Sequence, residues 1–385
     1  MQLKPLLADE YEDSPIKRRL DRLIAERAHG AHGVGIYCCY APLELIWAAG
    51  AVPIGLCATS QQPIAEAETI LPANLCPLIK SSFGFIITDT CPFYRMSDVV
   101  VAETTCDGKK KMFELIRDRK PMLTLELPQM PDEQEGLRLW ERSVGKLRRF
   151  LEEAFDSTIS DADIEDAIRE GNQRRRLLLE IMGYARHTPP LINWEEIKEI
   201  SALAGSFTGE SVVRLLEEIL EKLEDRRRAG IGVKEPDAPR VMVTGCPIGG
   251  DAEKVFQIIE DSGGVVVVQE ACTGIKPLWT MVEEGTADPM AAVARRYFEL
   301  PCSCMTPNSR RLKYMDELIE TYMPDVIIDV ILNCCHTYNI ESHVIKEHVA
   351  ARHGLPFLKI EIDYSEGDIG QLQTRIGAVL ELARG

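Results

Sequence analysis

Ten of the twelve cysteines follow segments that read as β-strands, at positions where turn residues end each strand. Thiolates are soft ligands for iron and zinc, and open α/β sheets bind ligands in the crevice beyond the carboxyl ends of their strands. Thiols drawn there from both halves of the chain indicate one shared metal site, and their number favours iron–sulfur chemistry. The ten are Cys38, Cys39, Cys76, Cys106, Cys246, Cys272, Cys302, Cys304, Cys334 and Cys335.

The spacing of the cysteines argues against the simpler metal and redox sites. Structural zinc sites use paired C-x₂₋₄-C knuckles, whereas this chain has one C-x-C, at Cys302 and Cys304, and two adjacent pairs. The C-x-x-C of thioredoxins and the closely spaced run of ferredoxins are both missing from the sequence. Two interpretations stay open: a cluster held by dispersed ligands between two domains, or thiols that are buried for structural reasons.

Other catalytic signatures are also missing. The sequence contains no P-loop, no G-x-G-x-x-G after a strand and no G-x-S-x-G elbow. His336, next to Cys335, is a candidate proton donor, with a structural hydrogen bond as the alternative. We interpret Lys109, Lys110 and Lys111 as a solvated helix face, with attraction of an anionic substrate or partner as the alternative.

Composition places the chain among ordinary globular proteins. Its 385 residues are 45% hydrophobic and 27% charged, enough for two or three domains with their own cores. A net charge of -17 disfavours binding to nucleic acid or to an anionic membrane. No stretch approaches the roughly 18 apolar residues of a membrane span, and the acid-rich N-terminal segment does not resemble a secretory signal. We therefore expect a cytoplasmic protein, in which structural disulfides are rare.

The elements that must position the thiols alternate between strand and helix. Short apolar strands separated by helices predict βαβ units and mainly parallel sheets. The expected strands are residues 33–37, 51–57, 98–104, 121–127, 240–245, 264–270, 325–332 and 355–363. Between the two sets, apolar residues recur at helical spacing. We predict an N-terminal α/β domain over 1–132, a helical region over 133–235 and a C-terminal α/β domain over 236–385, with cluster cysteines in both α/β domains.

The order of the cysteine-bearing segments resembles that of the 2-hydroxyacyl-CoA dehydratase D-component family, which includes benzoyl-CoA reductase subunits. The segments are GIYCCYAPLELIWAAGAVPIGLC, NLCPLIKSSFG, TTCDGKKKMFELI, PRVMVTGCPIGG, EACTG, VILNCCHTY and IEIDYSEGDIGQLQTRIGAVLE, and the similarity covers about 33–382. The resemblance implies two flavodoxin-like, doubly wound α/β domains with a helical insert and an iron–sulfur cluster between the domains. In the dehydratases three cysteines of each subunit bind one [4Fe–4S] cluster, and the matching positions here are Cys76, Cys106 and Cys335.

Extra thiols distinguish this chain from the dehydratase pattern. They are Cys246, the C-x-C of Cys302 and Cys304, and Cys91, and they make the chain similar to the single-subunit branch called double-cubane cluster proteins. That branch implies a homodimer with a double-cubane [8Fe–9S] cluster, in which two [4Fe–4S] cubanes share a sulfide and each is held by three cysteines. It also implies a separate ATP-dependent iron–sulfur reductase, an activator-type ATPase, as the electron donor.

The resemblance leaves the ligands of the second cubane to be chosen from the remaining thiols. We expect Cys246, Cys272 and Cys304 to hold it, because each lies at a strand end or in a loop that faces the crevice. Cys38, Cys91 and Cys302 are the reserves, and we interpret Cys39 and Cys57 as structural.

The leading functional hypothesis is a low-potential reductase of a small molecule, working under anaerobic conditions. One alternative is an (R)-2-hydroxyacyl-CoA dehydratase subunit with a single [4Fe–4S] cluster and a second, different subunit. A non-enzymatic alternative is an iron–sulfur electron carrier. The sequence contains no CoA-binding signature that would favour the dehydratase.

Overall fold

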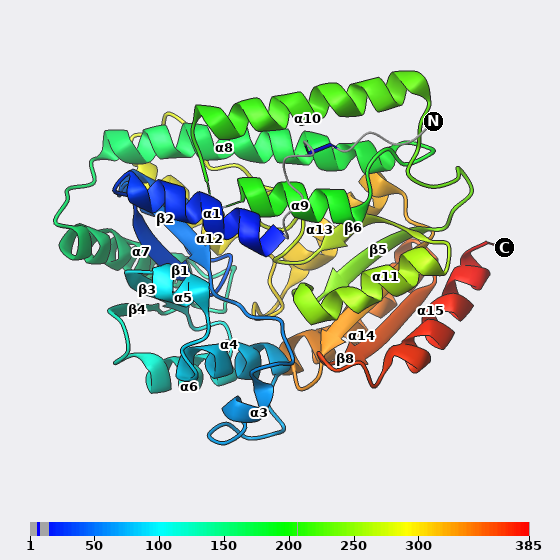
Figure 1. The fold of residues 1–385 in the computed structure, drawn as a ribbon, viewed down its shortest axis with the longest axis horizontal. Helices are drawn as coiled ribbons and strands as arrows, with labels where there is room; N and C mark the ends of the chain where they lie inside the picture. Colours follow the sequence, from blue (N-terminus) through cyan, green and yellow to red (C-terminus); the bar gives the residue numbers. More distant parts are fainter. Residues whose placement is uncertain (1–5, 8–14, 206, 385) are drawn as a thin grey trace.

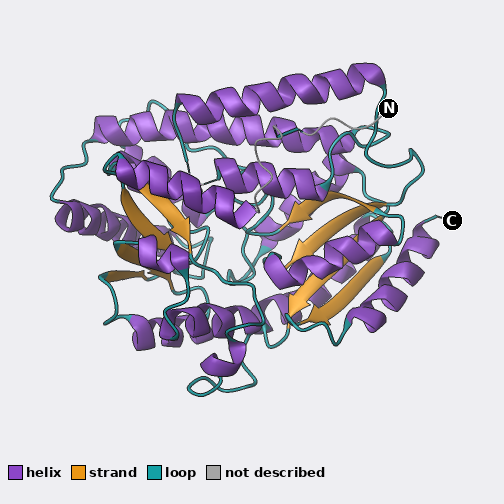
Figure 2. Cartoon of the chain, viewed as in Figure 1, coloured by secondary structure: helices purple, strands orange, loops and turns teal. Residues whose placement is uncertain are grey.

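Two parallel β-sheets form two lobes, and long helices cross one side of both (Figure 1). The computed structural model describes residues 6–7, 15–205 and 207–384. Helices surround each four-stranded sheet, as Figure 2 shows. The prediction of an α/β fold with two flavodoxin-like domains and a helical region is confirmed.

The N-terminal lobe has the strand order β2-β1-β3-β4, with every pair parallel. Its strands are β1 (His32–Ile36), β2 (Ala51–Gly55), β3 (Val99–Glu103) and β4 (Met122–Leu125). Its helices are α1 (Pro15–Ala28), α2 (Leu43–Ala48), α3 (Ile64–Ala67), α4 (Pro77–Ile87), α5 (Pro92–Met96) and α6 (Asp107–Ile116). The run VVVAE of β3 is buried at every position, as expected for a parallel strand that is covered on both faces.

The C-terminal lobe repeats this topology with the order β6-β5-β7-β8. Its strands are β5 (Arg240–Gly245), β6 (Val265–Glu270), β7 (Val326–Leu332) and β8 (Phe357–Ile362). The helical elements of this part of the chain are η2 (Gly250–Glu253), α11 (Lys254–Asp261), α12 (Pro289–Phe298), α13 (Ser309–Tyr322), α14 (His336–Arg352) and α15 (Ile369–Ala383). In both sheets the chain first adds a strand on one side of the starting strand and then crosses to the other. The switch points therefore lie between β1 and β3 and between β5 and β7, where open α/β folds bind ligands.

The stretch between the two sheets is helical, as its periodicity predicts. It contains α7 (Gln134–Phe155), α8 (Asp161–Gly183), η1 (Tyr184–Arg186), α9 (Trp194–Ala204) and α10 (Glu210–Ala229). Capping boxes start two of these helices, with Ser160 paired to Asp163 at α8 and Asn193 paired to Glu196 at α9. Helices α8 and α10 form the layer that crosses the top of both lobes in Figure 1.

One helix of the C-terminal third packs on the N-terminal lobe. Helix α12 shares a hydrophobic core with α7 and with one face of the β1 and β3 strands. The indole Nε1 of Trp140 donates to the carbonyl of Ala294 at 3.0 Å, and the Tyr40 hydroxyl donates to the carbonyl of Leu300 at 2.9 Å. The loop that follows α12 carries Cys302 and Cys304, so this packing brings C-terminal thiols toward the N-terminal lobe. The domain boundaries near 132 and 235 stay predictions.

Candidate metal centre

A cavity of about 1240 Å³ lies where the strand ends of the two lobes meet. It is lined by segments that follow β1, β2, β3, β5, β6 and β7, and by parts of α8 and α9. Of the twelve cysteines, all within the described residues, eleven line this cavity and only Cys91 does not. The topology therefore brings thiols from both halves of the chain to one place.

The first thiol group consists of Cys76, Cys106, Cys246 and Cys335. Cys76, Cys106 and Cys335 lie close enough to one another for their charges to interact, and Cys246 shares a hydrogen bond with Cys335. That hydrogen bond lowers the pKa of the Cys335 thiol to about 7, while burial raises the pKa of Cys76 to about 12. Hydrogen bonding and burial therefore shift the pKa values of these two thiols in opposite directions.

Three members of the first thiol group occupy equivalent positions in the fold. Cys76, Cys106 and Cys335 are the N-cap residues of α4, α6 and α14, each of at least ten residues. The Cys106 Sγ accepts a hydrogen bond from the backbone N–H of Lys109 at 3.5 Å. Because a helix N-terminus carries partial positive charge, three helix N-termini that border one cavity favour an anionic occupant.

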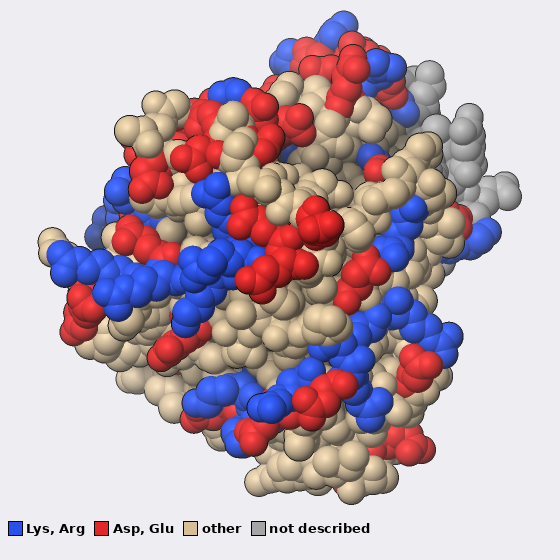
Figure 3. Space-filling model, turned by 90° about the vertical axis from the view of Figure 1, so that its left-hand side faces the viewer, with Lys and Arg blue, Asp and Glu red and all other residues tan. Residues whose placement is uncertain are grey.

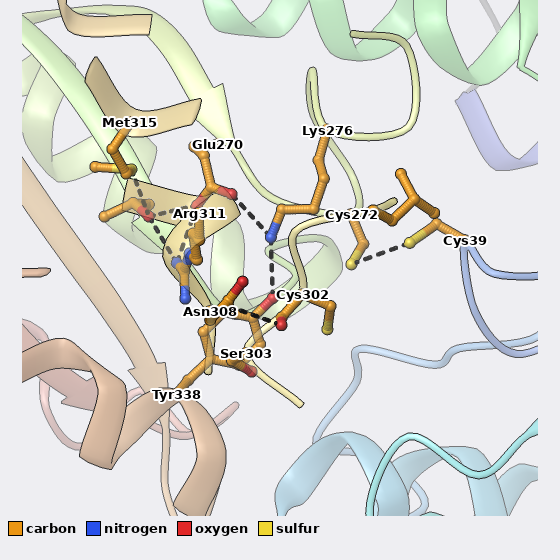
Figure 4. Close-up of polar contacts among 12 residues, drawn as sticks. Cys39, Glu270, Cys272, Lys276, Cys302, Ser303, Asn308, Arg311, Met315 and Tyr338 are labelled. Carbon is orange, nitrogen blue, oxygen red and sulfur yellow. Dashed lines mark hydrogen bonds and ion pairs between the residues drawn. The ribbon is translucent and has the colours of Figure 1, made fainter. Parts of the chain in front are cut away.

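The second thiol group consists of Cys38, Cys39, Cys272, Cys302 and Cys304, which lie on three loops. The Sγ atoms of Cys39 and Cys272 are 3.6 Å apart, so the two lobes touch here through sulfur (Figure 4). Cys38 pairs with Cys39, and Cys302 with Cys304, through side-chain hydrogen bonds. These hydrogen bonds lower the pKa of Cys38 to about 7 and that of Cys302 to about 5.

The two groups place several cysteines differently from the sequence-based expectation. Cys246 lies beside Cys335 in the first group, whereas we expected it with Cys272 and Cys304. Cys39, interpreted as structural, lies in the second group. Cys91, a reserve ligand, instead caps α5, with its Sγ accepting from the backbone N–H of Tyr94 at 3.3 Å. The assignment of ligands itself stays a prediction.

Cys57, Cys334 and His336 also border the cavity. Cys57 donates from Sγ to the carbonyl of Tyr37 at 2.8 Å. Cys334 has a φ of 63°, a left-handed conformation that is strained for a residue with a Cβ. This turn ends β7 and starts α14, and it places Cys335 at the helix cap. His336 is exposed and is the first residue of α14.

Two buried lysines, Lys109 and Lys276, accompany the thiol groups. Lys109 is 8% exposed and donates from Nζ to the carbonyl of Tyr37 at 2.8 Å. Burial opposes its charge, but the neighbouring thiols Cys38 and Cys57 outweigh burial and raise the pKa of Lys109. Interpreting 109–111 as a solvated helix face is therefore wrong for Lys109. The signal available was the position of this lysine in the first turn after Cys106.

Lys276 belongs to a buried charged network beside the second thiol group (Figure 4). Its Nζ lies 2.8 Å from Oε1 of Glu270 and donates to the Tyr338 hydroxyl at 3.2 Å. The guanidinium of Arg311 lies 3.0 Å from the other oxygen of Glu270 and also pairs with Glu341. Glu270 ends β6, two residues before Cys272. A carboxylate inside a buried strand requires charged or polar partners, so Glu270 was the sequence signal from which this network could have been predicted.

Basic residues outnumber acidic residues in the cavity lining, although the chain as a whole is acidic. Seven of its lining residues are Lys or Arg and three are Asp or Glu, in a chain of net charge -17. Figure 3 shows basic and acidic side chains intermingled over one outer face. Soft sulfur donors in two groups, three helix N-termini and buried cations together fit an anionic iron–sulfur cluster.

The chain belongs to the family described as 2-hydroxyglutaryl-CoA dehydratase, D-component, whose model matches residues 38–382. This family binds iron–sulfur clusters and works with a separate activator component. The chain is 43% identical over 350 residues, 91% of each chain, to YjiM of Escherichia coli (strain K12), which is named as a dehydratase subunit. It is 22% identical to the (R)-phenyllactyl-CoA dehydratase beta subunit of Clostridium sporogenes, over 91% of this chain and 92% of the relative. It is also 22% identical to lactoyl-CoA dehydratase subunit beta of Anaerotignum propionicum, over 95% of each chain.

These comparisons support an enzymatic role and confirm the family. The dehydratase names favour a lyase, which was the alternative to an oxidoreductase in the sequence analysis. Within the described residues, no helix combines the length and apolar character needed to cross a membrane.

Proposed function

We propose that this chain is a low-potential iron–sulfur reductase of small molecules, and that its cavity holds a double-cubane [8Fe–9S] cluster. The observation that carries the proposal is the division of the cavity thiols into two groups, one at helix caps and one on loops. A single [4Fe–4S] cluster with three cysteine ligands would use the first group and leave the second without a role. Two bridged cubanes would use both.

The fold suggests which thiols serve each cubane. The three N-cap thiols Cys76, Cys106 and Cys335 would hold the first. One thiol from each loop of the second group would hold the other: Cys272, with one of the 38/39 pair and one of the 302/304 pair. In this assignment Cys246 is an additional sulfur beside Cys335 rather than a ligand of the second cubane.

The surrounding residues would stabilise the charge of the bound group. Three helix N-termini and the ammonium groups of Lys109 and Lys276 oppose the negative charge of six thiolates. Tyr338 and Lys276 place O–H and N–H donors beside Cys272 and Cys302. When bound, the cluster would supply electrons at low potential, and His336 at the cavity edge is our proposed proton donor to the substrate.

A second candidate is a 2-hydroxyacyl-CoA dehydratase subunit, acting with a different partner subunit. The names of the relatives favour it, since all those compared are named as dehydratase subunits. In that case Cys76, Cys106 and Cys335 would hold one [4Fe–4S] cluster. The five thiols of the second group are the feature that this candidate does not use.

The two candidates differ in substrate and subunits but share an electron donor. We propose, from the resemblance to double-cubane cluster proteins, a homodimer that receives electrons from an ATP-dependent iron–sulfur reductase. The sequence contains no P-loop of its own, which agrees with ATP hydrolysis on a separate protein. Anaerobically purified protein alone should hydrolyse no ATP. With the activator-type ATPase, ATP and a strong reductant all present, it should reduce small unsaturated or nitrogenous substrates.

Omitting one component at a time tests this dependence by product formation. Equal turnover from the chemical reductant alone, without ATP or partner, would contradict a low-potential centre. Dehydration of an (R)-2-hydroxyacyl-CoA thioester by this chain with a second, different subunit would instead support the dehydratase.

A further inference from the structure

A cluster of metal-ligating side chains lies at the opposite end of α14 from the thiol cavity. It consists of Asp316, in the middle of α13, His348, in the last turn of α14, and His353, directly after α14. His348 follows the helix start at His336 by twelve residues, which is about 18 Å along an α-helix. The cluster is therefore separate from the cysteine site and does not rest on the proposed function.

The three side chains converge on one point. Their potential ligand atoms all lie within 4.8 Å of one another. The Nε2 atoms of His348 and His353 are 2.8 and 2.6 Å from the same oxygen, Oδ1 of Asp316. All three side chains are mostly buried, with exposed fractions of 22%, 13% and 12% for His348, His353 and Asp316. Two imidazole nitrogens and one carboxylate oxygen therefore lie together and could serve as three ligands of one metal ion.

The orientation of the Asp316 carboxylate suits a cation ligand. The Nε of Arg352 lies 3.2 Å from the other oxygen, Oδ2, on a side chain that is 59% exposed. A hydrogen bond to the non-ligating oxygen is the support that metal-binding carboxylates commonly receive. It leaves Oδ1 turned toward the two histidines.

The distances between the potential ligand atoms are close to those in a zinc site. Zinc binds nitrogen and oxygen at about 2.0–2.2 Å in tetrahedral geometry, which places neighbouring ligand atoms about 3.3 Å apart. The Nε2 to Oδ1 separations of 2.8 and 2.6 Å must therefore open by about 0.6 Å, which small side-chain rotations allow. Two histidines and one carboxylate leave the fourth position to water.

We propose that Asp316, His348 and His353 bind one divalent transition metal ion of the zinc class. The ion would join α13 to the end of α14. Helix α13 follows the loop of Cys302 and Cys304, and α14 begins directly after Cys335. The ion would thus fix, from the far side of the lobe, the two helices whose first turns adjoin the thiol groups.

The test is the zinc content and coordination of the iron–sulfur protein. Anaerobically purified full-length protein is given one equivalent of Zn²⁺ and passed through a desalting column, and metals are measured by mass spectrometry. We expect about one zinc per chain with a nitrogen and oxygen shell at about 2.0–2.1 Å in zinc X-ray absorption, rather than sulfur at about 2.3 Å. The absorption spectrum separates this site from zinc held by cavity cysteines.

Matched variants locate the ion. His348→Gln and His353→Gln keep an N–H donor for Asp316 but remove the imidazole, and each should reduce retained zinc to below about 0.1 per chain with iron unchanged. His343→Gln, at an exposed histidine of the same helix, should retain zinc. Failure of the wild-type protein to retain zinc, a sulfur shell, or equal retention by all variants would each overturn the proposal. The wild-type spectrum decides the question even where a variant fails to fold.

Discussion

Replacing Cys335 with alanine is expected to abolish activity and to remove most of the visible iron–sulfur absorption. Cys335 caps α14, shares a hydrogen bond with Cys246 and lies beside Cys76 and Cys106, so its sulfur is central to the first thiol group. Loss of one of three thiolates leaves an iron of the cubane without its protein ligand. Cys106→Ala should behave in the same way, because Cys106 caps α6 at the same point.

Two other cysteines provide controls for these variants. Cys91→Ala and Cys57→Ala should retain iron, absorption and activity, since Cys91 lies outside the cavity and Cys57 donates to a backbone carbonyl. Iron content and visible spectra of the anaerobically purified proteins, at equal concentration, provide the measurement. A Cys335→Ala protein with the iron content of the wild type would contradict the ligand role.

A Cys246→Ala variant tests the assignment of this thiol. The sequence predicted Cys246 as a ligand of the second cubane, whereas the structure places it beside Cys335 in the first thiol group. As an additional sulfur in the first group, it should be replaceable by alanine with loss of its hydrogen bond to Cys335 but with iron retained. Loss of about half of the iron in Cys246→Ala would instead support our sequence-based assignment of Cys246 as a ligand of the second cubane.

The second large effect is expected at a buried ion pair between α2 and α8. Glu44 is 0% exposed, and the guanidinium of Arg175 binds its Oε1 while also donating to Asn172. Burial opposes ionisation of Glu44, but Arg175 and Arg296 outweigh it and lower its pKa. Arg175→Ala removes the main partner of a buried carboxylate, and we expect it to lower the free energy of unfolding by about 3–5 kcal/mol.

The neighbouring residue offers a matched control. Arg176 is on the same helix and pairs with Glu284 at 3.3 Å, but its side chain is 56% exposed. Arg176→Ala should change stability by less than about 1 kcal/mol, because exposed ion pairs contribute little. Denaturant unfolding of both variants under the same conditions makes the comparison. If the Arg175→Ala protein is as stable as the wild type, the prediction is wrong, and Glu44 is then either protonated or paired with another residue in the variant.

Much of the fold could be predicted because its signals are local. Each of the eight strands is a short apolar run bounded by turn residues, and each was expected within three residues of its observed bounds. The helical stretch likewise follows from the spacing of Trp140, Val144, Leu147 and Leu151, all fully buried. Parallel pairing follows from the alternation of strands and helices.

The details of the site depend on contacts between distant segments, which local patterns do not contain. Cys246 directly follows β5, and the order β6-β5-β7-β8 places β5 between β6 and β7, so Cys246 could lie beside either Cys272 or Cys335. The structure selects Cys335. Lys109 was predicted to be exposed, like Lys110 and Lys111, because the sequence does not show that the first turn of α6 faces the cavity. The network of Lys276 and Arg311 joins residues 35 positions apart, with no motif to link them.

The most direct test of the double-cluster proposal is the iron and sulfide content of the anaerobically purified chain. Two thiol groups, each with at least three sulfurs, predict about eight irons and about nine sulfides per chain. About four irons would contradict the double cubane and support a single cluster on Cys76, Cys106 and Cys335. Absence of iron, with zinc bound by the cavity cysteines instead, would contradict the iron–sulfur assignment itself.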